Sequence, residues 1–265
     1  MVRIGRAHVR GPRQAISGPP KGKGDMARRM VCVLALATAV IAASAVPSLY
    51  AAESGTVADR IIEAYGGKER LSAVHSIAAE GRITAFMRGD EGTYRRTLRR
   101  DGSLVVDIVY SRSSERRVLH NGKGYRSTGG KFEEVTGPRL HAMVHQYNEL
   151  DLPYSLLDGS CSVTELRGDT VNGDAVRVLR CTDRPGNRME VFVNAENYRI
   201  VKCEGTFAVG TETTSLSAEF GDFRTIDGVI LPFRIVNYAG GRKISVTTID
   251  RYFINPAVDD ALFRP

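Results

Sequence analysis

Large apolar residues occupy every second position in one stretch near the end of the chain. The members of this set are Val229, Leu231, Phe233 and Ile235. Side chains of a β-strand point alternately to its two faces, so these four share one face and Arg234 lies on the other. A second alternating run covers residues 244–248, and Gly240-Gly241 between the two runs supplies the positive φ of a tight hairpin. The pattern predicts antiparallel strands with one apolar face.

The same period of two predicts strands over residues 76–135 and again over residues 161–207. Turn signals such as Asp101-Gly102 and Asn121-Gly122 separate the runs. One face of the first region carries Leu104, Val106, Ile108 and Tyr110. We count about eleven to thirteen strands at spacings of roughly 8–12 residues, which is typical of a sandwich or a barrel. A barrel of this strand number is wide enough to enclose a ligand.

Two regions break the strand pattern with helical spacing. Residues 56–75 begin at Thr56, whose side chain can cap a helix together with Asp59 three residues later. A second helix is predicted to begin at Pro138 and to end at Pro153. Its apolar positions are Leu140, Met143, Val144 and Tyr147. An amphipathic helix is therefore predicted in the middle of a β domain.

The first 51 residues are predicted to be a leader. The basic pair Arg28-Arg29 precedes an apolar run, and Ala51 supplies a processing site. This order is typical of a secretory signal peptide over residues 26–51, with an uncleaved anchor as the alternative. Residues 1–25 are polar and precede that pattern, which makes Met26 a second candidate for the start of translation.

The basic excess of the chain lies in this leader. The whole chain carries 37 Lys and Arg against 30 Asp and Glu, a formal net charge of +7, but eight of the basic residues and only one acidic residue precede residue 52. Residues 52–265 are therefore neutral and are predicted to form a single exported domain. Binding to nucleic acid needs basic residues that neutralise phosphates, so no nucleic-acid partner is expected.

Three cysteines follow the leader, at positions 161, 181 and 203. Cys161 opens one predicted strand and Cys181 ends the next, so the two can meet across a hairpin, and export permits a disulfide. Cys203 would then remain a free buried thiol. The alternative is that all three are small buried side chains, because an odd number leaves the pairing undetermined.

Signals of catalysis are weak. The sequence contains no nucleophile elbow, phosphate-binding loop or dinucleotide fingerprint. His141 and His145 lie four residues apart on the predicted mid-chain helix, the spacing by which zinc sites place two imidazoles on one face, but no third ligand is evident. A metal-dependent enzyme that uses these histidines is the weakest alternative. We therefore predict no catalytic residue, no metal and no cofactor.

Six arginines cluster in neighbouring predicted strands: Arg95, Arg96, Arg99, Arg100, Arg116 and Arg117. A solvated outer face explains them most simply. The sharper alternative is an arginine at the rim of a cavity, where it binds the mid-chain helix or an anionic lipid headgroup, because guanidinium suits bidentate acceptors.

A series of features closes the chain in a characteristic order. They are Asp227-Gly228, Leu231-Pro232, a strand to Asn237, a glycine turn, another strand, then Asn255, Asp259-Asp260 and Phe263 before Pro265. This order resembles the end of the LolA-like family of periplasmic lipoprotein carriers. The resemblance extends less clearly back to about residue 56.

The resemblance implies an α+β fold: an antiparallel, incomplete β-barrel with an N-terminal helix and a mid-chain helical lid. An apolar cavity in such a half-barrel would hold acyl chains. The concave face would then be lined by Leu104, Val106, Ile108, Tyr110, Val229, Leu231, Phe233 and Ile235. The lid would close over it with Leu140, Met143, Val144 and Tyr147. Ordinary core packing of the same helix is the alternative.

The function implied by the resemblance is that of a non-enzymatic periplasmic carrier or chaperone. It would bind the acyl chains of lipoproteins or other lipids, in outer-membrane lipoprotein sorting, as a monomer between an inner-membrane donor and an outer-membrane acceptor. The alternative is an envelope-stress sensor, or a lipid-responsive binding module of the same fold, that acts on a protein partner.

Overall fold

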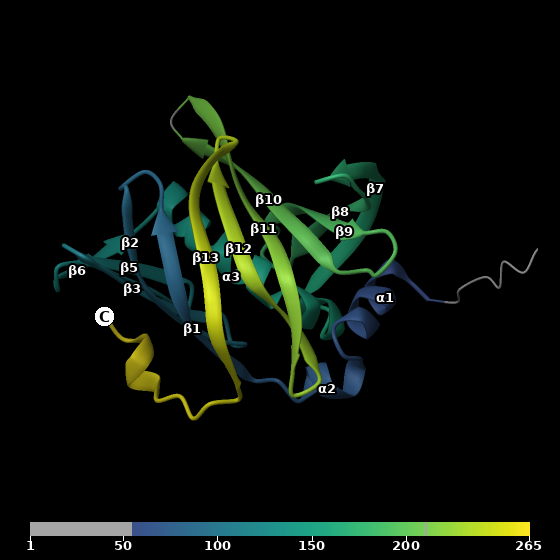
Figure 1. Ribbon diagram of the computed structural model, residues 1–265, viewed down its shortest axis with the longest axis horizontal. Coiled ribbons are helices and arrows are strands. Elements are labelled where there is room, and N and C mark those ends of the chain that lie inside the picture. Colours follow the sequence, from purple (N-terminus) through teal and green to yellow (C-terminus); the bar gives the residue numbers. More distant parts are fainter. Residues whose placement is uncertain (1–54, 210) are drawn as a thin grey trace, which may run out of the picture. The chain divides into compact units, whose positions relative to one another are not determined.

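Thirteen antiparallel strands form one continuous sheet in the computed structural model, which describes residues 55–209 and 211–265 (Figure 1). Their order in the sheet is β6-β5-β4-β3-β2-β1-β13-β12-β11-β10-β9-β8-β7. The first and last strands of the domain, β1 and β13, therefore pair in the middle, whereas β6 and β7 form two free edges. The sheet is not closed, which confirms the predicted incomplete antiparallel barrel.

The strand boundaries follow the predicted alternation closely. The strands are β1 (Ser76–Ala85), β2 (Asp90–Arg99), β3 (Ser103–Tyr110), β4 (Ser114–His120), β5 (Lys123–Thr128), β6 (Phe132–Val135), β7 (Cys161–Val171), β8 (Asp174–Asp183), β9 (Arg188–Asn194), β10 (Ile200–Val209), β11 (Glu212–Ile226), β12 (Val229–Ala239) and β13 (Arg242–Ile254). Both turns that flank β12 have two residues with positive φ, Asp227-Gly228 and Gly240-Gly241. Such turns match the right-handed twist of a hairpin, which fixes the register of β12 against both neighbours.

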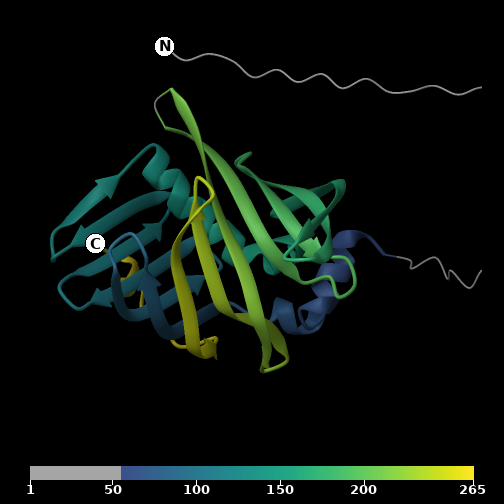
Figure 2. The same cartoon turned by 45° about the horizontal axis from the view of Figure 1, so that its top comes forward.

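A helix joins the two free edges of the sheet. This helix, α3 (Pro138–Leu157), follows β6 and precedes β7, and it contacts β5, β7 and β10. Figures 1 and 2 show it on the inner side of the curved sheet. Two N-terminal helices, α1 (Val57–Ala64) and α2 (Lys68–Ser72), pack against it. The predicted cap of α1 is present, because the side chains of Thr56 and Asp59 each bond the other's backbone N–H.

The prediction that Pro153 ends the mid-chain helix is wrong. Pro153 lies inside α3, which continues to Leu157. Proline removes one helical hydrogen bond, but the neighbouring Leu152 and Tyr154 are 0% and 1% exposed, and their burial stabilises this last turn. The helix is also not amphipathic along its whole length, because residues 151–156 are buried all round.

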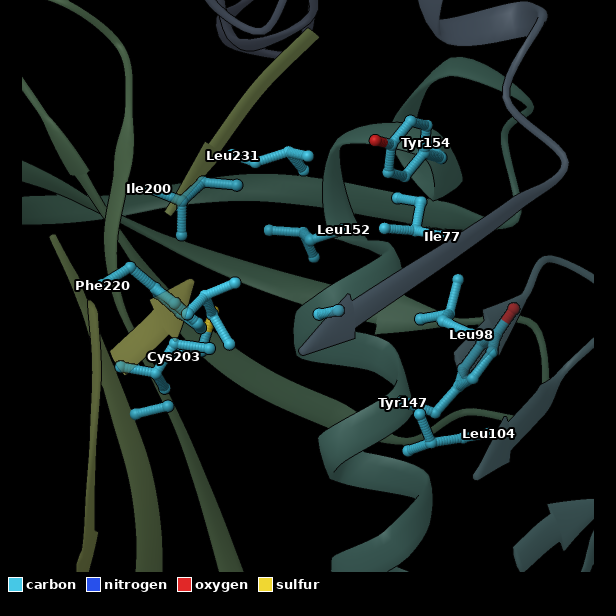
Figure 3. Close-up of a cluster of buried hydrophobic side chains, with 14 of the residues drawn as sticks. Ile77, Leu98, Leu104, Tyr147, Leu152, Tyr154, Ile200, Cys203, Phe220 and Leu231 are labelled. Carbon is cyan, nitrogen blue, oxygen red and sulfur yellow. The ribbon is translucent and has the colours of Figure 1, made fainter. Parts of the chain in front are cut away.

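The main hydrophobic core lies between α3 and the concave face of the sheet. Figure 3 shows Tyr147, Leu152 and Tyr154 of α3 among side chains of the surrounding strands. The strand residues in that view include Ile77, Leu98, Leu104, Ile200, Phe220 and Leu231. The helix therefore contributes directly to the core of the domain.

The C-terminal segment packs on the opposite, convex face. A short helical turn, η1 (Asp260–Phe263), buries Phe263 against Val105 and Val118 of β3 and β4. Arg116 donates a hydrogen bond to the carbonyl oxygen of Leu262, 2.8 Å away. The Asp259-Asp260 pair thus lies at the start of the turn that anchors the C-terminal segment, where the Asp259 side chain accepts from the backbone N–H of Ala261.

Candidate functional site

A groove of about 960 Å³ runs along α3 between the two edges of the sheet. One wall is formed by residues near the β2–β3 and β4–β5 turns, and the other by residues of β7 to β10 and the segment 184–188. Its apolar side chains include Leu119, Leu140, Val144, Met189 and Phe207. A volume near 1,000 Å³ is at the upper end of the range for ligand pockets. Polar side chains, among them Asn148, Asp183, Arg184 and Arg188, also line the groove.

The wall formed by β7 and β8 is held by covalent and polar links. Cys161 and Cys181 form a disulfide across these strands with their Cα atoms 6.2 Å apart, and both line the groove. The amide of Asn148 on α3 donates to Asp183 of β8 over 2.8 Å, and Asp183 also accepts from the Asn187 side chain over 2.7 Å. The helix is thus tied to one edge of the sheet at the floor of the groove.

Two smaller cavities lie on the other side of α3, toward the central strands. One has a volume of about 170 Å³ and is lined by residues of α3, β1, β2, β4, β11, β12 and β13. The other has a volume of about 40 Å³ and lies between the second half of α3 and the strands β1, β2, β12 and β13. His145 lines both the groove and the 170 Å³ cavity, so its ring lies between the two spaces.

The eight residues predicted to line a lipid cavity all lie on the buried, concave side of the sheet, each at most 9% exposed. They belong to the main core cluster, together with Met143 and Tyr147 of the predicted lid. Of the eight, Leu231 contributes to the 40 Å³ cavity and Ile235 to the 170 Å³ cavity. Six pack in the core without lining either cavity or the groove: Leu104, Val106, Ile108, Tyr110, Val229 and Phe233.

The predicted lid residues divide between the two sides of the helix. Leu140, Val144 and Tyr147 line the groove, while Met143 is buried at 6% exposure. Tyr147 reaches over the β2–β3 turn, where its hydroxyl accepts a hydrogen bond from the backbone N–H of Gly102 over 3.1 Å. The apolar surface that the helix exposes therefore faces the groove, away from the concave face of the sheet.

The six clustered arginines also divide by the faces of their strands. Arg95 is exposed and pairs with Glu80, and Arg99 and Arg116 bind the C-terminal segment on the convex face. The other three reach toward the helix, namely Arg96, Arg100 and Arg117. The solvated outer face thus accounts for only part of the cluster.

Two of these inward arginines bind α3 directly. Arg100 donates to Asp151 over 3.3 Å and to Asp158 over 2.6 Å. Arg117 donates to the side-chain oxygen of Gln146 over 3.0 Å. These bonds hold both halves of the helix to the β2–β4 side of the sheet.

The burial of three polar residues of α3 was not predicted from the sequence. His145, Glu149 and Asp151 are each at most 9% exposed. Burial raises the pKa of Glu149 to about 8 and the pKa of Asp151 to about 7, although nearby arginines lower both in part. Burial lowers the pKa of His145 to about 4. At neutral pH, His145 and Glu149 are therefore mostly uncharged, with Nε2 of the imidazole 3.5 Å from Oε2 of the carboxyl group.

A period-two reading of β2 would have found Arg96. It shares a face with Tyr94 and Leu98, both buried, and it is itself only 6% exposed. For the buried polar residues of α3 no comparable signal exists, because their positions face the sheet only once the helix is docked.

The two histidines considered as metal ligands differ in their surroundings. His141 is exposed, whereas His145 is buried and packs on Gly205 and Phe207. Across the described ranges 55–209 and 211–265, no group of three His, Cys, Asp or Glu residues is placed to hold a metal ion. Among the helices of those ranges, none is long and apolar enough to cross a membrane.

Several solved structures have a similar fold. A LolA superfamily protein from Nitrosomonas europaea matches 80% of this chain and 99% of its own, with a TM-score of 0.50 and 16% identity. A DUF1329 family protein from Desulfovibrio piger covers 78% and 95%, with a TM-score of 0.50 and 12% identity. An outer membrane lipoprotein-sorting protein domain from Vibrio parahaemolyticus covers 78% and 94%, with a TM-score of 0.49 and 10% identity.

The two matches with TM-scores of 0.50 show that the fold is LolA-like, as the order of features near the C-terminus implied. No protein-family model and no curated protein matches the chain. At identities of 10–16% the structural likeness concerns the fold, and the function must be argued from the groove itself.

Proposed function

We propose that this protein is an exported, non-enzymatic carrier that binds acyl chains of lipids or lipoproteins in the groove along α3. The observation that carries the proposal is the groove of about 960 Å³, whose exposed surface is more apolar than polar, in a LolA-like fold. The ligand would enter between the two free edges of the sheet and lie on Leu140 and Val144 of the helix. Its polar end would face Asp183, Arg184 and the residues around them.

Apolar burial supplies enough free energy for this role. Each buried methylene contributes about 0.8 kcal/mol, so eight methylenes contribute about 6 kcal/mol before the cost of ordering the ligand. A carrier must also release its cargo, and a groove that stays open along one side leaves part of the chain accessible to an acceptor. Binding of intermediate strength is therefore what the geometry favours.

The concave face that the sequence singled out is a second place for an acyl chain. In the structure the side chains of α3 fill most of that space, and the two cavities left there measure about 40 and 170 Å³. A chain of lipid length would enter it only if α3 moved away from the sheet. Such a movement would break the bonds of Arg100 and Arg117 to the helix.

Transfer of a fluorescent acyl lipid between donor and acceptor vesicles tests the proposal. The wild-type protein should accelerate transfer in proportion to its concentration. Val144→Glu places a carboxylate on the floor of the groove and should reduce binding and transfer at least tenfold, because an unpaired charge in an apolar site is costly. The matched control is Val109→Glu, the same substitution at a residue that is 56% exposed on β3.

Two results would contradict the proposal. Either the wild-type protein binds no acyl lipid and leaves transfer unchanged, or Val144→Glu and Val109→Glu behave alike. Capture of a protein partner without any lipid binding would favour a binding module that acts on another protein.

A further inference from the structure

Arg96 is a buried cation on the concave face of the sheet. It lies on β2 and is 6% exposed, with its guanidinium directed into the space behind α3. The same side chain lines the 40 Å³ and the 170 Å³ cavity. A buried charge is costly unless it is paired, so its partners decide what the site does.

The described residues leave part of this guanidinium without a partner. The neutral side chains of Tyr94 and Tyr252 lie beside it, with Cζ of Arg96 5.9 Å from the centroid of the Tyr252 ring, but its Nε and Nη1 atoms have no hydrogen-bond partner within residues 55–209 and 211–265. The hydroxyl of Tyr252 donates to the carbonyl oxygen of Pro232 over 2.6 Å. Neutral groups thus surround the guanidinium without neutralising its charge.

The carboxyl group nearest in this space does not neutralise it either. Glu149 of α3 lines both cavities, yet no ion pair joins it to Arg96 among the described residues. Because burial raises the pKa of Glu149 to about 8, its side chain is mostly protonated at pH 7. Arg117 also lines the 170 Å³ cavity, but it forms an ion pair with Glu115 over 3.3 Å. At neutral pH Arg96 is therefore the cation of this cavity that lacks a counter-charge within the described ranges.

The 170 Å³ cavity has a polar and an apolar part. Its polar side chains include Asn237, Ser245 and Thr247 beside the two arginines. Its apolar side chains include Ile83, Leu150, Leu216, Ile235 and Ile244. A water molecule takes about 30 Å³ of liquid volume, so the space suits a headgroup with a short apolar chain and is too small for a whole lipid.

We infer that the cavity behind α3 binds an oxyanion, a carboxylate or a phosphate, on Arg96, with a short apolar chain packed against Ile235 and its neighbours. Guanidinium is a strong hydrogen-bond donor to either oxyanion, and its Nε and Nη1, which have no partner among the described residues, can each donate one hydrogen bond to such a ligand. The inference deepens the proposed function by adding an anionic ligand class. It concerns a cavity separate from the groove, so the two can fail independently.

Isothermal titration calorimetry with matched ligands tests this. Octanoate and 1-octanol have the same chain length and differ in the oxyanion, and inorganic phosphate alone distinguishes a free anion from an amphiphile. The wild-type protein at pH 7 should bind octanoate at least tenfold more tightly than 1-octanol. Arg96→Met should abolish this preference, whereas Arg95→Met, on the exposed face of the same strand, should leave it unchanged. Equal affinities for the two ligands in the wild type would overturn the inference, and so would a preference that survives Arg96→Met.

A second readout keeps the inference testable if Arg96→Met does not fold. Between pH 7 and 9 Glu149 ionises and competes with the ligand for Arg96, so octanoate should bind about tenfold more weakly at pH 9. Glu149→Gln should remove this pH dependence. The other titratable or charged groups around Glu149 in the two cavities are His145, Tyr154, Tyr65, Tyr94, Arg96, Arg117, Cys203, Tyr238 and Tyr252. Burial raises the pKa of Cys203 and of Tyr252, and the His145 pKa of about 4 keeps its imidazole neutral, so none of these groups replaces the effect of Glu149 over this range. A constant affinity from pH 7 to 9 in the wild type would contradict the inference.

The groove variant separates this inference from the proposed function. Val144→Glu should impair lipid transfer and leave the preference for octanoate over 1-octanol intact. Transfer that proceeds normally in a protein with no such preference would overturn the oxyanion site alone. A clear preference in a protein that transfers no lipid would instead overturn the carrier proposal.

Discussion

Replacing Phe233 by alanine tests whether the concave face is a filled core. Phe233 is 3% exposed on β12, its ring lies 5.2 Å from that of Tyr252 in an edge-to-face contact, and it lines none of the cavities described above. Loss of a buried phenylalanine ring costs about 3–5 kcal/mol, because transfer free energy is lost and a cavity remains. For a domain of about 200 residues, a loss of 1 kcal/mol lowers the melting temperature by roughly 2–4 °C. The expected decrease is therefore roughly 6–20 °C.

Urea unfolding followed by circular dichroism measures this change directly. The midpoint should fall while the slope with urea stays constant, because the surface exposed on unfolding is almost unchanged. The matched control is Phe253→Ala on the neighbouring strand, where the ring is 42% exposed and the cost should stay below about 1 kcal/mol. If the two variants lose similar stability, the space around Phe233 is an open ligand cavity and the packing of α3 described here is wrong.

Three further changes probe the helix and the edge of the sheet. The Glu149 pKa is raised above its ordinary value, so the folded state binds more protons than the unfolded state. The free energy of unfolding should therefore fall as pH rises from about 4.5 to 8. Glu149→Gln should flatten this fall in urea titrations at several pH values. Arg100→Met leaves the buried Asp151 of α3 without its cation and should lower the free energy of unfolding by about 2–4 kcal/mol in thermal unfolding. The control Arg95→Met, at an exposed residue, should cost less than about 0.5 kcal/mol. Equal losses in the two variants would refute the role of Arg100. Replacing Cys161 and Cys181 by serine opens a short covalent loop and should cost about 3 kcal/mol, and an unchanged urea midpoint would contradict that expectation.

The strands were predictable because their signal is local. In β12 the alternation of apolar residues between Asp227-Gly228 and Gly240-Gly241 specifies one face and two turns without reference to any other part of the chain. The cap at Thr56 is local in the same way. Sequence order near the C-terminus then implied which fold these strands would build.

The position of the open space was not predictable, because it depends on how α3 docks. The sequence placed apolar residues on the helix and on the sheet, and a cavity between them was the natural expectation. In the structure the helix fills most of that space, with Leu152 and Tyr154 buried on either side of Pro153. The larger space lies on the other side of α3, and its walls combine β4 with β8, β9 and β10, which follow β4 in sequence only after β5, β6, α3 and β7. Such a set is assembled by sheet topology and leaves no periodic signal.

Photo-cross-linking with a fatty acyl lipid that carries a diazirine in its chain tests the central claim most directly. Mass spectrometry of the cross-linked peptides would locate the chain on the protein. The account predicts adducts in the first half of α3, around Leu140 and Val144, and on β9 and β10 near Met189 and Phe207, with strong depletion in Val144→Glu. Adducts confined to the convex face near Val109 and Phe253, or a yield that Val144→Glu leaves unchanged, would contradict it.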